Sequence, residues 1–187
     1  MDAFLLALIL TFVIALGGRE QLIIAQFSLQ MERNLPLLII GVFCAIATAA
    51  VMAYAGSMIA EVLPRRAAEM LVAFALIAAA IELAWPVKIK PMKEPTRSYV
   101  AIGAVLVFRQ LGDAARFAIF AIAAWAVFPT TALIGGALAG AAAVVLGWSL
   151  GAEVLQRIPL RAIRLVLAVC SGVAGAVIGL NARFQFL

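Results

Sequence analysis

Apolar residues fill this chain in six long runs that are separated by short polar connections. A helix needs roughly 20 apolar residues to cross about 30 Å of hydrocarbon, and each run is long enough. The runs are rich in Ala, Leu, Val and Ile and show no alternating polar face, which favours helices over barrel strands. We therefore predict an all-α polytopic membrane protein with six transmembrane helices, at about 3–29, 35–62, 66–86, 98–128, 130–155 and 160–182.

Composition narrows the class of protein further. Of the 187 residues 67% are hydrophobic and 12% are charged, whereas a soluble domain has about 45–50% apolar and about 25% charged residues. This excludes a disordered chain, a nucleic-acid-binding domain and an ordinary soluble enzyme. The chain has no His, and its two cysteines, Cys44 and Cys170, lie inside apolar runs. We expect no disulfide framework, no resident metal or bound cofactor, and no catalytic activity.

The chain divides at its longest polar stretch into two halves of three helices each. We predict a first repeat at 1–86, a basic cytoplasmic linker at 87–97 and a second repeat at 98–187. Ala60-Glu61-Val62-Leu63 near the end of the second predicted helix recurs as Ala152-Glu153-Val154-Leu155 near the end of the fifth. Two similar halves with an odd number of spans have opposite topology, as in many secondary transporters whose site lies at the repeat interface.

Charge and small residues indicate how the bundle sits in the bilayer. More Lys and Arg lie on the side of the 87–97 linker than on the opposite side. The positive-inside rule then predicts a bacterial-type inner (plasma) membrane protein with both termini outside. Gly136-x-x-x-Gly140, Gly147-x-x-x-Gly151 and Gly175-x-x-x-Gly179 allow helices to approach closely, which suits internal packing and also homo-oligomerisation.

Polar residues interrupt the middle of the first predicted helix. They are Gly17, Gly18, Arg19, Glu20 and Gln21. A charge at the centre of a membrane helix costs about 2.5–3.5 kcal/mol on insertion scales, so Arg19 and Glu20 need partners. The two glycines allow a local helix break that exposes backbone carbonyls.

A matching cluster interrupts the fourth predicted helix, and it comprises Arg109, Gln110, Gly112, Asp113 and Arg116. In a continuous helix, positions 109, 113 and 116 share one face, so both arginines flank Asp113. We predict Gly112 as the helix break of this half.

We expect the two clusters to face each other across the repeat interface. Glu20 is then expected to meet Arg109 or Arg116, and Arg19 to meet Asp113. Such a cluster forms either a polar path for an ion or proton, or a static salt-bridge network that only fixes helix packing. Three arginines against two acids sum to a positive charge, which repels a divalent cation.

The arrangement of predicted helices and polar motifs resembles the calcium/manganese–proton antiporter family that includes transmembrane protein 165. Members have two inverted three-helix halves, each with a Glu-x-Gly-Asp-(Lys/Arg)-(Thr/Ser) motif that is usually followed by Gln. The corresponding segments here are Ala15-Leu16-Gly17-Gly18-Arg19-Glu20-Gln21 and Gln110-Leu111-Gly112-Asp113-Ala114-Ala115-Arg116. Three motif acids are replaced, by Ala15, Gly18 and Gln110.

The resemblance implies antiport of Mn²⁺ or Ca²⁺ against protons. Asp113 and Glu20 would be the ion or proton ligands, because hard divalent cations prefer carboxylate oxygens. Gln21 and Gln110 would be auxiliary ligands on the transport path. The counter-charges would be Arg19, Arg109 and Arg116.

Two other functions stay open at this stage. The loss of motif acids suits a degenerate membrane scaffold or accessory subunit that transports nothing. The arginines instead suit an exporter of a small organic or anionic solute, held by bidentate contacts.

Overall fold

Helices account for nearly all of the chain that the structure describes, which covers residues 2–30, 34–86, 98–157 and 159–184 in a computed structural model. The helices are α1 (Asp2–Ala15), α2 (Arg19–Gln30), α3 (Leu35–Val62), α4 (Arg65–Ala84), α5 (Tyr99–Leu111), α6 (Ala114–Trp125), α7 (Pro129–Arg157) and α8 (Leu160–Phe184). The predicted linker at 87–97 lies outside the described residues. All-helical architecture is thus confirmed for the described part of the chain.

Four helices in the described segments are long and apolar enough to cross a membrane: α3, α4, α7 as far as Gly151, and α8. Their bounds lie close to the predicted spans, because length and hydropathy define such helices well. The first predicted span is instead a pair, α1 and α2, bent by 61°. It counts as a fifth span if the bent pair is taken as one.

The fourth predicted span, 98–128, is also not continuous. Its residues form two shorter apolar helices, α5 and α6, which are separated at Gly112 and Asp113. Hydropathy alone did not predict this, because the break removes only two residues from an otherwise apolar run. The long apolar helices α3, α4, α7 and α8 support a multi-pass membrane protein.

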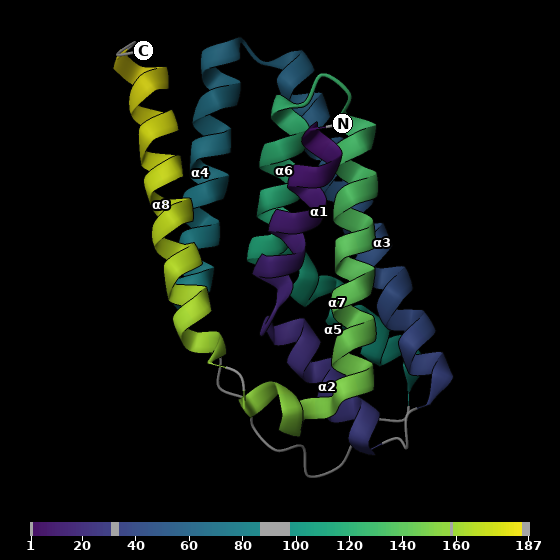
Figure 1. Ribbon diagram of the computed structural model, residues 1–187. Coiled ribbons are helices and arrows are strands. Elements are labelled where there is room, and N and C mark those ends of the chain that lie inside the picture. The colour runs from purple at the N-terminus through teal and green to yellow at the C-terminus, as the bar shows by residue number, and fades with distance from the viewer. Residues whose placement is uncertain (1, 31–33, 87–97, 158, 185–187) are drawn as a thin grey trace.

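The helices pack as a tight bundle with one splayed pair. α7 lies along α1, α2 and α3, while α6 packs against α3, α4 and α1. α4 and α8 run side by side at one edge of the molecule (Figure 1). The start of α1 and the end of α8 lie at the same end of the bundle (Figure 1).

Glycines allow backbones to touch at several of these contacts. A Cβ on Gly147 of α7 would lie 2.8 Å from the Gln21 carbonyl oxygen, and one on Gly175 of α8 would lie 2.9 Å from the Ala73 carbonyl oxygen. Gly136 similarly faces Ile119 of α6. The small-residue motifs therefore serve packing within the chain.

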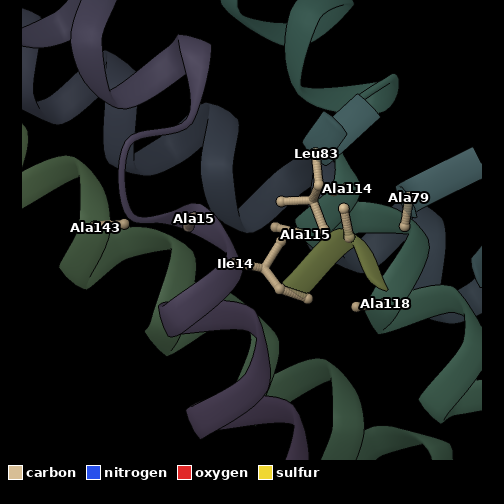
Figure 2. Packing of buried hydrophobic residues seen from close by; sticks show 9 residues of the cluster. Ile14, Ala15, Ala79, Leu83, Ala114, Ala115, Ala118 and Ala143 are labelled. Carbon is tan, nitrogen blue, oxygen red and sulfur yellow. The ribbon is translucent and has the colours of Figure 1, made fainter. Parts of the chain in front are cut away.

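A core of small side chains occupies the middle of the bundle, where α1, α4, α6, α7 and α8 converge (Figure 2). Its buried members are Ile14, Ala15, Ala79, Leu83, Ala114, Ala115, Ala118, Ala143 and Ala168. Alanines let five helices meet closely, and this alanine core lies next to both helix breaks along the chain.

Candidate functional site

The first helix break is held by a glutamine. Gly17 has a left-handed φ of 70°, which glycine adopts without steric cost. Its backbone N–H donates to Gln21 Oε1 over 2.7 Å, and Gln21 Nε2 donates to the Ala143 carbonyl oxygen of α7 over 3.1 Å. Buried Gln21 thus ties the broken turn to α7 through both ends of its amide.

The second break depends on an aspartate rather than on its glycine. Gly112 has φ −94°, which any residue adopts. Asp113 is the N-cap of α6, and its Oδ2 accepts from the Ala115 N–H over 3.3 Å. Such a cap satisfies one of the free N–H groups at a helix start. Asp113 is buried, so it brings a carboxylate into the bundle at this point.

A buried ion pair links the two breaks. Arg116 Nη1 of α6 lies 3.5 Å from Glu20 Oε1 of α2, and the two side chains are 0% and 2% exposed. Glu20 also lies in the first turn of α2, where the helix dipole favours a negative charge. The structure thus joins Glu20 to Arg116, one of the two partners considered from the sequence.

Thr48 of α3 connects this ion pair to Gln110. Arg116 Nε donates to Thr48 Oγ1 over 3.0 Å, and the same hydroxyl lies 3.0 Å from Gln110 Oε1 and 2.8 Å from the Cys44 carbonyl oxygen. Sequence reasoning missed Thr48, because threonines in helices commonly bond their own backbone and give no signal of a site.

A second ionic group contains two residues that sequence reasoning also missed. Arg164 Nη2 of α8 donates to Glu82 Oε2 of α4 over 3.0 Å and to Oε1 over 3.2 Å. Arg19 Nε lies 3.8 Å from the same Glu82 carboxylate. Glu82 and Arg164 lie near the ends of apolar runs, where charges usually face the headgroups, so their burial was not foreseen.

Two predictions about the arginines of this site are therefore wrong, namely the pairing of Arg19 with Asp113 and the placement of Arg109 beside Asp113. Arg19 meets Glu82 rather than Asp113. Arg109 is exposed, whereas Arg116 is fully buried. Positions 109, 113 and 116 share one face only in a continuous helix. Because the chain breaks between α5 and α6, these three residues do not lie on one helix face.

The charges of the site balance. Glu20, Glu82, Arg116 and Arg164 all lie within electrostatic range of Asp113. Together with Arg19, the cluster has three acids and three arginines, so its formal charges sum to zero, whereas the set expected from the sequence summed to a positive charge. The first half contributes two acids and one arginine, and the second half contributes the reverse.

Several polar atoms of this charge cluster have no hydrogen-bond partner within the described part of the chain. They are Glu20 Oε2, Gln110 Nε2, Arg116 Nη2, and Nε and Nη1 of Arg164. Buried polar atoms are nearly always satisfied by protein or water, so these atoms are candidates for contact with a ligand or water.

Resident metal binding is a separate question. In the described segments no three acidic, cysteine or histidine side chains are grouped so that they could hold a metal ion. A cation held here would need amide, hydroxyl or carbonyl oxygens beside the carboxylates, or a different arrangement of the carboxylates.

Comparison with known proteins gives a family match over the first half of the chain. Residues 3–90 match the family model described as divalent cation/proton antiporter GDT1. Comparison with curated proteins found no match, and neither did comparison with solved structures. The matched segment contains α1 to α4, the broken first span, and Glu20 and Glu82 of the charge cluster. Over residues 3–90 the chain is thus similar to a family of divalent cation/proton antiporters, which is a family of transporters and not an enzyme class.

Proposed function

We propose that this protein exchanges a divalent cation, Mn²⁺ or Ca²⁺, for protons at the buried charge cluster. The observation that carries the proposal is that Glu20, Glu82 and Asp113 belong to one charge cluster, in a chain whose residues 3–90 match this family. Hard cations prefer carboxylate oxygens, and the same oxygens bind protons. One set of groups could therefore hold either substrate in turn.

In this mechanism the arginines act as internal counter-charges. Arginine stays protonated, so it releases a carboxylate only by moving away from it. A cation would displace Arg116 from Glu20, whose Oε2 has no partner among the described residues. Protons arriving from the other side would neutralise the carboxylates and release the cation. Gln21 and Gln110 would supply auxiliary oxygens.

The proposal includes six spans arranged as two inverted repeats. Support comes from the helix breaks, which occupy corresponding places in the two halves, at Gly17 and at Gly112–Asp113. Further support comes from the pairing of α4 with α8, the third predicted helix of each half. Alternating access would then rock one half against the other around the charge cluster.

The test is Mn²⁺ and Ca²⁺ flux into proteoliposomes under an imposed pH gradient. Glu20→Gln and Asp113→Asn remove charge at little change in volume, and Asn caps a helix about as well as Asp. Glu61→Gln and Asp2→Asn are matched controls at exposed positions. We expect gradient-driven flux that both cluster variants abolish and both controls retain. Folded protein that moves neither ion would overturn the proposal.

One observation favours a second candidate, export of a small anionic solute. Arg116 and Arg164 bury guanidinium N–H groups without a partner in the described residues, and such groups bind carboxylates well. Flux of a small dicarboxylate in the same proteoliposomes, with no Mn²⁺ or Ca²⁺ flux, would support this candidate. A scaffold would move neither kind of solute and would respond to charge removal only through its stability.

A further inference from the structure

A crevice lies beside the pair formed by α4 and α8. It has a volume of about 490 Å³, and residues of α4 and α8 line one side while residues of α1 and α6 line the other. Its walls include Leu6, Leu76, Ile122 and Ile178. The volume is within the range of about 300–1,000 Å³ that is typical of small-molecule sites.

The inner end of this crevice is closed by the alanine core. Ala118 belongs to both the crevice wall and the alanine core, and Leu10 lines the crevice and packs against the same core. The crevice therefore ends before the charge cluster. Among the residues that line it, only Asp2 and Thr131 have polar side chains other than the indole of Trp125.

Because the lining residues are mostly apolar, the crevice suits a hydrocarbon chain. Apolar cavities stay dry, because water there finds no hydrogen-bond partners. A hydrated cation is excluded for the same reason. In a bilayer, the apolar material beside such helices is the lipid acyl chain.

A second cavity adjoins the crevice and has a different character. Its volume is about 530 Å³, and Val72 and Trp125 line both cavities. Arg65 and Glu69, at the start of α4, lie in its wall. Arg65 Nε lies 2.9 Å from Glu69 Oε1, and the Arg65 side chain is 92% exposed. An exposed guanidinium beside a tryptophan is typical of the headgroup level of a membrane.

We propose that the two cavities together form a binding site for one phospholipid with an anionic headgroup. One acyl chain occupies the apolar crevice, and the phosphate lies at Arg65, where it competes with Glu69 for the guanidinium. Arginine suits this role because it binds phosphate oxygens through two parallel N–H bonds. The site lies apart from the charge cluster and does not depend on the antiport mechanism.

The acyl-chain part is tested by filling the crevice. Ala174 lines the crevice and is exposed, whereas Ala176, two residues along the same helix, is exposed but does not line it. Ala174→Phe and Ala176→Phe are therefore matched variants. Native mass spectrometry of purified protein titrated with dioleoyl phosphatidylglycerol measures the dissociation constant of the first bound lipid. We expect Ala174→Phe to weaken it about tenfold, because the ring overfills the space that the acyl chain needs, and Ala176→Phe to leave it unchanged.

The headgroup part is tested with a second matched pair. Arg65→Gln removes the guanidinium from the cavity wall, and Arg66→Gln removes its exposed neighbour. We expect wild type to prefer phosphatidylglycerol over phosphatidylcholine with the same chains, and only Arg65→Gln to lose that preference. Equal effects of the two Phe variants would overturn the site. Equal binding of both lipids by the wild type would overturn the anionic headgroup.

Discussion

The ion pair between Glu20 and Arg116 is expected to be strongly coupled in stability. At an effective dielectric constant near 20, two unit charges 3.5 Å apart attract by about 5 kcal/mol. Removal of one partner from a buried pair costs about 3–5 kcal/mol, because the other charge stays buried without compensation. Both side chains are almost fully buried, so this range applies here.

A double-mutant cycle measures this coupling. Glu20→Gln and Arg116→Met are each expected to lower the free energy of unfolding by about 3–5 kcal/mol, and the double variant is expected to recover most of the loss. The assay is equilibrium unfolding in mixed micelles, followed by circular dichroism. The Arg116 variant also removes the donor to Thr48, so its loss should be the larger of the two.

The surface pair of Arg65 and Glu69 supplies the control cycle. Its atoms are closer, at 2.9 Å, but the Arg65 side chain is 92% exposed. Exposed i,i+4 pairs are worth only about 0.3–0.5 kcal/mol. A coupling energy for Glu20 and Arg116 that is no larger than that of this control would refute the reasoning that burial, rather than distance, determines the strength of the pair.

Three further tests, two of them matched pairs of variants, probe the geometry around the charge cluster, each measured as the free energy of unfolding in the same micelles. Gly17→Ala is expected to cost at least about 1–2 kcal/mol, because φ is 70° and the new Cβ would lie 2.9 Å from Leu160 Cβ. Gly112→Ala has φ −94° and open space, so it should be nearly neutral, and equal losses at the two glycines would contradict this account. Glu82→Gln leaves Arg164 without its counter-charge and is expected to cost about 3–5 kcal/mol, against at most about 0.5 kcal/mol for exposed Glu61→Gln; a Glu82 loss as small as the Glu61 loss would show that Arg164 is satisfied elsewhere. Gln21→Ala removes both hydrogen bonds that hold the first break and is expected to cost about 1–3 kcal/mol, and an unchanged stability would mean that the break does not depend on this amide.

The helices were the predictable part of the fold. Long apolar runs define their own ends, so α3 begins and ends where the sequence placed it, and α4, α7 and α8 differ from prediction by about two residues. The break at Gly17 was visible in the sequence as a glycine pair beside charges. The break at Gly112–Asp113 was also visible as a glycine beside charges. Residue spacing did not predict which side chains share a face, because that depends on the angle between the two helix segments.

The sequence predicted which residues inside the apolar runs belong to the site. It did not predict the residues that only helix packing brings to the site. Charged and amide groups inside apolar runs indicate burial, and five such residues are buried in the structure: Glu20, Gln21, Gln110, Asp113 and Arg116. Glu82 and Arg164 looked like ordinary headgroup residues, because only the packing of α4 against α8 brings them inward. Arg109 had the same sequence signal as Arg116 and yet is exposed.

The placement of Glu82 changes what the missing motif acids mean. Counted by motif, the chain has lost acids at Ala15, Gly18 and Gln110, which argued for a scaffold without transport. Counted in space, a third carboxylate reaches the charge cluster from α4, and three arginines balance the three acids. A neutral cluster no longer repels a divalent cation, and each half presents the charge that the other half needs. In the proposed antiport, a cation that replaced an arginine at one carboxylate would alter the attraction between the two halves, and binding would then drive a conformational change.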